Sequence, residues 1–299
     1  MISFCIPIYN FDVRPLVMGL HKQLCLENTE CEIILIDDAS TPEYSAPNNQ
    51  LAELKWVKYR ILPENIGRSR IRNLLAIEAR FPYLVFLDCD SELPDNLFVK
   101  RYLQQLPFDG VVCGGRSYSG KSPGDNYILH WRYGINRETT NAAQRSHRQY
   151  HSFMSNNFMV ARNVLLNHAF NEQLTGYGHE DTLFGYELKK NFIPILHIEN
   201  PLLHKGLDTN REFLLKTIEG IKNLAFIYNN LQSGKEFAKT SKLLALYIHL
   251  RHWKLTGVVA LLFRWLKNPI EQNLLGRNPN LLLLDFYKLG ILIHHNQAN

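Results

Sequence analysis

The chain has 299 residues, 45% of them hydrophobic, and a net charge of +5 from 33 Lys and Arg against 28 Asp and Glu. This composition excludes a disordered chain and allows a large core, in one domain or in a domain with an appendage. The weak positive charge would suit an anionic small ligand or an anionic membrane surface. It is too small to indicate a nucleic-acid partner.

Strand-like and helix-like segments alternate through the first 115 residues. Continuous apolar runs predict strands over 2–9, 32–36, 56–62, 82–87 and 110–114. Helices are expected over 14–26, 69–79 and 95–105, and the stretch DDASTPEYSAPNN from residue 37 is expected to be rich in turns. Strands that are apolar throughout are typical of a sheet buried on both faces. The pattern therefore predicts an α/β fold with a mostly parallel sheet flanked by helices.

The second half of the chain changes character twice. Residues 115–150 are polar, basic and aromatic, and they predict a long loop with some helix. Strands return over 155–161 and 193–198, with a helix starting in GYGHEDTLFGYELKK between them. From residue 211 the sequence is apolar, basic and helix-rich. We therefore expect a catalytic domain over 1–206 and a helical C-terminal region over 207–299.

Two features bear on the cellular compartment. The five cysteines are scattered, and none has CxxC spacing, which favours a reducing, cytoplasmic compartment over a disulfide framework or a zinc site. The start, MISFCIPIYN, has neither the basic nor the apolar region of a signal peptide. No uncharged apolar window reaches the roughly 18 residues that a spanning helix needs.

Polar clusters follow four of the expected strands. They read PIYN, DDAS, PENIGRSR and DCDSE in chain order. A parallel sheet binds ligands beyond the carboxyl ends of its strands, so these clusters should meet along one edge.

The last cluster pairs Asp88 with Asp90. Two carboxylates one residue apart are not comfortably ionised in a dry site unless a cation joins them. Mg²⁺ or Mn²⁺ fits best, because it takes oxygen ligands and leaves room for substrate phosphates. The alternative is a solvated turn before the next helix.

Each of the other clusters also has a functional and a structural interpretation. Asp37 or Asp38 could accept a hydrogen bond from a base or a ribose hydroxyl, or could serve only in an Asx turn. Arg68 and Arg72 could form an anion site at a helix start, or could cover a solvated face.

Three residues further along could complete such a site. Glu180 and Asp181 begin a helix, where one of them could serve as a general base or both could be simple partners of the helix dipole. His204 ends a short apolar run and could be a third metal ligand or a structural histidine.

In this order, PIYN, IDDAS, ENIGRSRIRN, LDCDSE and GYGHED resemble the inverting family 2 glycosyltransferases of the GT-A, or Rossmann-like, fold. The resemblance covers about residues 1–206. GHEDTLFGYELKK also resembles the C-terminal Glu-Asp motif of galactosyltransferase-type members, with Tyr177 where tryptophan is common. The resemblance implies a hexosyltransferase of polysaccharide or glycolipid synthesis. It would carry a sugar from a nucleotide-sugar, expected to be a UDP-sugar, to a saccharide or lipid-linked saccharide.

The resemblance also implies roles for individual residues. Asp181 would be the catalytic base, and Glu180 would bind acceptor or donor hydroxyls. Asp88, Asp90 and His204 would hold Mn²⁺ or Mg²⁺. The remaining implied contacts are to nucleotide and donor sugar, from Pro7, Tyr9, Asn10, Asp37, Asp38, Asn65, Arg68, Arg72 and Asp88.

Two other functions stay open on the residues alone. A phosphatase of the haloacid dehalogenase type also follows an apolar strand with DxD and Ser, and it would use Asp88 as nucleophile. That motif normally lies on the first strand, whereas three strand–helix units precede it here. The second alternative is a sugar- or nucleotide-binding module without catalysis.

The tail has its own pattern. Between residues 247 and 267, leucines and aromatic residues are mixed with Arg and Lys. Such a helix could lie on an anionic membrane face, which would place the protein peripherally on the cytoplasmic side. A helical bundle packed on the catalytic domain, or on a partner in a homo-oligomer, explains the pattern equally well.

Overall fold

The computed structural model describes residues 1–27 and 29–298, and the chain forms two compact units. The first contains Met1–Ser119, Glu138–Thr175 and Glu180–Gly206. The second contains Gly120–Arg137, Gly176–His179 and the chain from Leu207 onward. The two short insertions in the second unit come from the part of the sequence that we assigned to the catalytic domain.

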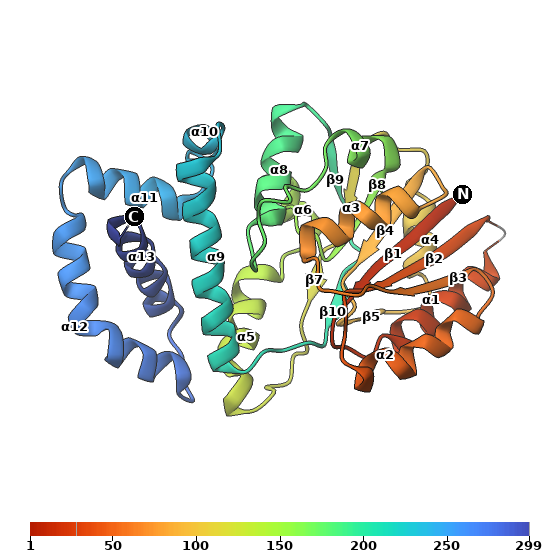
Figure 1. Cartoon of the computed structure of the whole chain (residues 1–299), viewed down its shortest axis with the longest axis horizontal. Coiled ribbons are helices and arrows are strands. Elements are labelled where there is room, and N and C mark those ends of the chain that lie inside the picture. Colours follow the sequence, from red (N-terminus) through yellow and green to blue (C-terminus); the bar gives the residue numbers. More distant parts are fainter. Residues whose placement is uncertain (28, 299) are drawn as a thin grey trace. The chain divides into compact units, whose positions relative to one another are not determined.

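The first unit is built on a seven-stranded sheet (Figure 1). Neighbouring strands are paired in the order β3-β2-β1-β4-β8-β6-β9. Strands β1 to β4 are parallel to one another, whereas β8 runs antiparallel to both β4 and β6. The strands are β1 (Ile2–Ile8), β2 (Cys31–Asp37), β3 (Val57–Ile61), β4 (Tyr83–Leu87), β6 (Val111–Cys113), β8 (Asn157–Ala161) and β9 (Ile195–His197). The expected mostly parallel α/β sheet is confirmed.

Helices cover both faces of this sheet, as the apolar strand sequences require. Along β1, Phe4 and Ile6 join one core with helices α1 and α4, while Cys5 on the opposite face joins a second core with α3, α7 and α8. The alternation follows from the two-residue side-chain period of a strand. The helices of the unit are α1 (Arg14–Leu26), α2 (Pro42–Asn49), α3 (Arg68–Glu78), α4 (Phe98–Leu103), α6 (Ala142–Ser146), α7 (Arg162–Asn167) and α8 (Glu180–Lys190).

Two local predictions were wrong. The stretch expected to be turns contains α2 and a 3₁₀ turn over Gln50–Glu53, because Pro42 stands in the first helical turn, where proline is tolerated. Helix α4 begins at Phe98 instead of residue 95, because the Asp95 carboxylate accepts the Leu97 N–H at 2.8 Å in a preceding turn.

A small three-stranded sheet places His204 beside the DxD segment. Its order is β5-β10-β7, with β5 (Ser91–Glu92), β10 (Leu202–His204) and β7 (Arg116–Ser117). β10 is antiparallel to β5, with His204 opposite Ser91. The Lys205 N–H also donates to the Asp90 carbonyl at 2.8 Å.

The second unit is helical, and its core gathers Leu214, Phe263, Leu274, Leu284 and Tyr287. Within the described residues, no helix combines the length and apolar character that crossing a membrane requires. The helices are α5 (Ile128–Tyr133), flanked by a 3₁₀ turn over Asp125–Tyr127 and a π-helical turn over Gly134–Glu138, then α9 (Asn210–Asn230), α10 (Gly234–Ala238), α11 (Lys242–His252), α12 (Thr256–Leu275) and α13 (Leu281–Ala298).

Candidate active site

The polar clusters after β1, β2 and β4 meet at the carboxyl-terminal edge of the sheet in the first unit. Strands β1, β2 and β4 are parallel, so their ends point the same way. Asn10 joins the first two clusters: its N–H donates to the Ser40 hydroxyl at 2.8 Å, and its side-chain oxygen accepts the Thr41 N–H at 2.9 Å. Nearby, Tyr9 is 54% exposed and Pro7 is half-buried, so both are accessible at this edge.

The carboxylates after β2 fasten the surrounding loops. Asp37 is fully buried and accepts the Ser40 N–H and the Tyr59 hydroxyl, both at 2.7 Å. Asp38 accepts the N–H groups of Ile66 and Gly67 at 2.7 and 3.0 Å. These bonds fix the loop that carries Arg68, and a nucleotide contact by either carboxylate stays a prediction.

Asn65 belongs to the same loop. Its side-chain amide donates to the Asp38 carbonyl at 3.2 Å, and Gly67 follows with a φ of 84°, which favours glycine. The loop therefore enters helix α3 in a fixed direction, with Arg68 as the first helical residue.

Three guanidinium groups surround the Asp88 carboxylate. Arg72 donates to Oδ1 at 2.8 Å, while Arg116 and Arg68 approach Oδ2 at 3.3 and 3.5 Å. Arg72 is 1% exposed, and its burial, followed by the charge of Arg68, lowers its pKa. Each guanidinium group offers several N–H donors, so this cluster is also suited to bind the oxygens of a further anion, as a diphosphate would be.

Glu180 supplies part of the balancing charge from the start of α8. Arg68 Nε donates to Glu180 Oε1 at 2.7 Å, and Arg72 Nη1 lies 3.7 Å from the same oxygen. Burial would raise the pKa of Glu180, but the charges of Arg68 and Arg72 and the hydrogen bond from Arg68 outweigh it, so the pKa falls below its usual value. Glu180 is therefore ionised and held in place.

Asp181, the next residue, is in the opposite electrostatic situation. Its Oδ1 accepts the Thr182 N–H at 2.6 Å and the Thr182 hydroxyl at 3.2 Å, and it makes no ion pair within the described residues. Burial, together with the negative charge of Glu180, raises the pKa of Asp181 to about 6. A carboxylate with a pKa near neutrality is a stronger base than an ordinary aspartate.

Asp90 and His204 lie together, although 114 positions apart in sequence. His204 Nδ1 is 3.5 Å from Asp90 Oδ1, and the imidazole packs edge-on against Tyr118 at 5.2 Å. Burial would raise the pKa of Asp90, but the hydrogen bond and charge of His204, with Arg116 and Arg68, lower it. The three residues that we expected at a metal site, Asp88, Asp90 and His204, are thus brought to one end of the sheet.

A divalent cation fits these residues if substrate phosphates and water supply most of its ligands. No group of three or more His, Cys, Asp or Glu in residues 1–27 and 29–298 is arranged to hold a metal by itself. The buried Asp90 Oδ1 meets His204 Nδ1 at the long distance of 3.5 Å, which leaves this oxygen able to coordinate a cation. Mg²⁺ and Mn²⁺ sites that also bind substrate commonly use one or two carboxylates and take their remaining oxygens from substrate phosphates and water.

Other buried polar atoms of the site also lack hydrogen bonds. They are Glu180 Oε2, Arg72 Nε and Arg116 Nε, all within the described part of the chain. Buried polar atoms are satisfied in the great majority of cases, and exceptions point to catalysis, an ion or a ligand. The unsatisfied atoms therefore mark the same edge of the sheet as the DxD segment does.

The sequence analysis did not identify three residues of the site, Arg116, Tyr118 and Glu138. Arg116 also approaches Glu138 Oε2 at 3.2 Å, and the Tyr118 hydroxyl donates to Glu138 as well. A signal was present: GRSY follows the predicted strand 110–114, and that strand proves to be parallel to β4. Glu138 had no local signal, because it lies in a segment without strand or helix periodicity.

Cys89, between the two aspartates, is poorly suited to nucleophilic attack. Burial, with the negative charge of Asp90, raises the pKa of its thiol to about 12. The thiolate needed for attack is therefore absent at neutral pH.

The comparison with protein families agrees with this geometry. The family described as "Glycosyl transferase family 2" matches residues 3–169, which is more than half of the chain. The chain therefore belongs to glycosyl transferase family 2 and is a glycosyltransferase. This membership decides against the phosphatase and against the binding module without catalysis. The position of DxD after β4 is a further argument against the phosphatase.

A curated relative and two solved structures are similar to the chain. The chondroitin synthase of Escherichia coli is 26% identical over 225 residues, which take in 62% of this chain and 32% of the synthase. The chain thus spans about a third of that relative's length.

The solved structures show the fold. A mannosyltransferase from Pyrobaculum calidifontis, in complex with GDP-Man and Mn²⁺, superposes with a TM-score of 0.58 at 11% identity, covering 99% of this chain and 86% of that one. S. aureus TarS 1-349 in complex with UDP-GlcNAc gives 0.52 at 14% identity, covering 100% and 92%. The expected GT-A fold is confirmed by these likenesses.

Proposed function

We propose that the protein transfers a sugar from a UDP-sugar to a hydroxyl of a saccharide or lipid-linked saccharide, with inversion at the anomeric carbon, in the synthesis of a surface polysaccharide or glycolipid. The observation that carries the proposal is the group of three arginines around Asp88, next to the paired Asp90 and His204. The E. coli chondroitin synthase and the UDP-GlcNAc complex of TarS support a UDP-sugar and a polysaccharide product.

The donor would lie along the carboxyl ends of β1, β2 and β4. Pro7, Tyr9 and Asn10 would line the nucleotide pocket, and Asp38, 4% exposed, is better placed than the fully buried Asp37 to contact the base. Asn65 would contact the nucleotide from the same loop.

The diphosphate would be held by the arginines. Arg68 is 39% exposed at its side chain, whereas Arg72 is 1% exposed, so the side chain of Arg68 is the more accessible to a ligand. Asp88 would keep these arginines in position and face the ribose and donor sugar. Bidentate guanidinium contacts are well suited to phosphate oxygens and lower the energy of a departing diphosphate.

Asp90 would hold Mn²⁺ or Mg²⁺, with His204 beside it. A cation there offsets the charge of the leaving diphosphate when it is bound. The Mn²⁺ in the P. calidifontis mannosyltransferase supports this assignment. The site has two more carboxylates than guanidinium groups, which also favours a divalent cation. The groups counted are Asp88, Asp90, Glu138, Glu180 and Asp181 against Arg68, Arg72 and Arg116.

Asp181 would act as the general base. Its carboxylate takes the proton of the acceptor hydroxyl as that oxygen attacks the anomeric carbon from the face opposite the diphosphate. The bond from the anomeric carbon to the diphosphate oxygen breaks, and its electron pair leaves with the nucleoside diphosphate. This single displacement inverts the anomeric configuration and needs no covalent nucleophile. Glu180, held by Arg68, would bind a sugar hydroxyl through its unpartnered Oε2.

A donor screen tests the proposal. Release of nucleoside diphosphate is measured with UDP-glucose, UDP-galactose, UDP-GlcNAc, UDP-GalNAc and GDP-mannose, with oligosaccharide acceptors, and with or without Mn²⁺. We expect release from a UDP-sugar that requires Mn²⁺, and a product of inverted anomeric configuration by NMR. Release from no donor, or a product with retained configuration, would contradict the proposal.

A further inference from the structure

Helix α12 of the second unit presents an exposed apolar face in addition to the face that packs in the core of its unit. Val258, Leu261, Leu262, Trp265 and Leu266 are 45–71% exposed and form what we term the outer face of α12. At 100° per residue they fall within an arc of about 140°. A separate arc of the helix carries its buried residues, which pack in the core shared with α13. The outer face is therefore not the side by which the helix is held in its unit.

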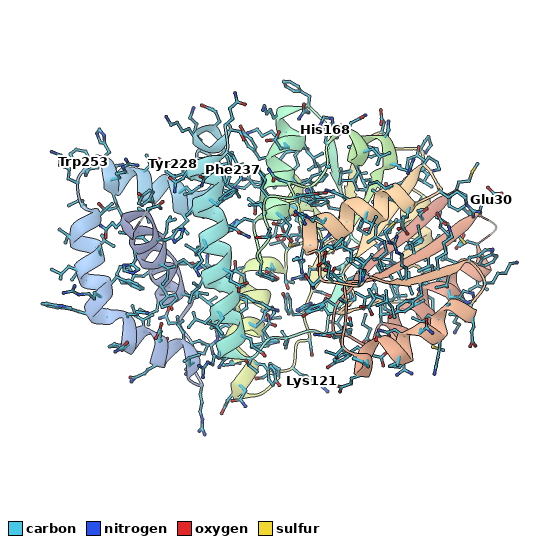
Figure 2. The ribbon with its side chains drawn as sticks, in the orientation of Figure 1. Glu30, Lys121, His168, Tyr228, Phe237 and Trp253 are labelled. Atoms are coloured by element: carbon cyan, nitrogen blue, oxygen red, sulfur yellow. The ribbon has the colours of Figure 1, made fainter. Side chains whose placement is uncertain are left out.

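The apolar surface continues at the turn before the helix. Trp253, labelled in Figure 2 between α11 and α12, is 62% exposed, and Leu255 is 45% exposed. Soluble proteins carry single exposed apolar residues everywhere, but a contiguous patch with two tryptophans marks an interaction site. Tryptophan is also the side chain most enriched at membrane–water interfaces.

The charge of this segment identifies the partner. Residues 241–270 contain five Lys and Arg and no Asp or Glu, while the rest of the chain contains 28 of each. The whole net charge of +5 therefore resides in these 30 residues. Arg251 and Lys254 precede the outer face and Arg264 lies beside it; all three are exposed, and none has an ion-pair partner within the described chain. An apolar helix face bordered by cations is the pattern of a helix that lies in an anionic lipid interface.

A second copy of the chain fits this surface less well. Two such faces packed together would bring six cations close, Arg251, Lys254 and Arg264 from each copy, and none of the three has an ion-pair partner in the described chain. An anionic bilayer instead supplies negative charge around the rim and hydrocarbon beneath the apolar side chains. A helix in this position lies in the interface without crossing the bilayer, consistent with the lack of a spanning helix in residues 1–27 and 29–298.

We propose that the outer face of α12, with Trp253 and Leu255, is a membrane-binding surface for anionic lipid. The inference does not depend on the proposed reaction, because lipid binding needs neither donor nor acceptor. It adds a location for the enzyme: the surface of a bilayer, where lipid-linked saccharides are also found.

Co-sedimentation with vesicles tests the proposal. The full chain is mixed with vesicles of phosphatidylcholine alone or with 30% phosphatidylglycerol, and we expect binding to the anionic vesicles only. The double variant Leu262→Ser with Trp265→Ser should lower that binding at least tenfold, because it removes two apolar side chains that the bilayer would bury. The matched control is Leu26→Ser with Phe192→Ser, since these residues are 76% and 90% exposed in the first unit. The control should bind as the wild type does.

A second variant tests the charge separately. Replacement of Arg251, Lys254 and Arg264 by Gln should weaken binding to the anionic vesicles about a hundredfold, since each cation near such a surface contributes about 1 kcal/mol. The matched control replaces three lysines that are exposed in the first unit, Lys22, Lys100 and Lys190, by Gln, and it should bind like the wild type.

Three results would overturn the proposal. The first is no binding to anionic vesicles, and the second is equal binding by the α12 variants and their controls. The third is a dimer in analytical ultracentrifugation that only the Leu262 and Trp265 variant dissociates, since this would identify a second copy as the occupant. Circular dichroism of each variant establishes that it is folded before it is compared.

Discussion

Neighbouring acidic residues at the start of α8 should affect stability in opposite directions. The pKa of Asp181 is raised from 3.8 to about 6, mainly by burial and then by the charge of Glu180. A carboxyl group whose pKa is raised on folding destabilises the folded state increasingly as pH rises from its unfolded pKa to its folded pKa, and by a constant amount above that. Asp181→Asn should therefore stabilise the protein at pH 8. The amide oxygen can still accept the hydrogen bonds from Thr182.

The size of the effect follows from the shift. Two pKa units correspond to about 3 kcal/mol at about 1.4 kcal/mol each, an upper bound because Asp181 is half-buried. The gain should be near zero below pH 4, grow between pH 4 and 6, and level off above pH 6. Glu180→Gln should do the reverse, because ionised Glu180 balances Arg68 and Arg72. Removal of one partner of a buried ion pair costs roughly 3–5 kcal/mol, and this loss should shrink as pH falls from the usual pKa of Glu180 through the lower pKa that it has in the folded state.

Urea denaturation followed by circular dichroism at pH 4.5, 6 and 8 measures both variants. Asp181→Asn should gain stability relative to the wild type as pH rises from 4.5 to 8, whereas Glu180→Gln should be less stable than the wild type at all three pH values. The reasoning is refuted if Asp181→Asn is no more stable than the wild type at pH 8, or if its stability difference is the same at all three pH values.

Three further changes test the proposed reaction. Asp181→Asn should reduce turnover at least a thousandfold with little change in UDP affinity, and residual activity near that of the wild type would exclude Asp181 as the base. A pH–rate profile of the wild type should show turnover rising with pH through about 6, as Asp181 loses its proton. Gly206→Ala would place a Cβ 2.6 Å from Asp90 Oδ2, so it should weaken Mn²⁺ binding by about tenfold or more in calorimetry, and unchanged binding would exclude Asp90 as a ligand. Arg116→Ala should weaken UDP binding about ten- to a hundredfold through loss of a charge-assisted contact, whereas an affinity within twofold of the wild type would restrict Arg116 to supporting Asp88.

The sheet could be predicted because its strands carry the signal within themselves. Runs such as ISFCIPI and YLVFL are apolar at nearly every position, which is typical of a sheet covered on both faces. Helix α2 was missed because its two prolines and two asparagines outweighed its weak apolar pattern. The insertion of Gly120–Arg137 into the second unit depends on long-range contacts, such as the Asn210 side chain accepting the Leu129 N–H at 2.9 Å, and no local pattern encodes them.

In the candidate site, too, some residues could be predicted from local sequence and others could not. The sequence could predict that residues directly after parallel strands lie close together, because parallel strands end at the same edge of the sheet. The residues alone left His204 open between a metal ligand and a structural histidine, since its strand, β10, is three residues long and belongs to a separate small sheet. The three-arginine environment of Asp88 was not foreseen. Sequence gives the order of residues along each strand, but not which side chains turn toward a shared carboxylate.

Thermal denaturation with UDP and Mn²⁺ tests the central claim most directly, namely that the carboxyl-terminal edge around Asp88 and Asp90 binds a metal together with a diphosphate. Saturation at about a hundred times the dissociation constant should stabilise the wild type by about 2.7 kcal/mol, a shift of several degrees. We predict this shift only when UDP and Mn²⁺ are present together. It should be lost in Asp90→Asn and kept in Asp109→Asn, an exposed control. An equal shift without Mn²⁺, or an undiminished shift in Asp90→Asn, would contradict the account.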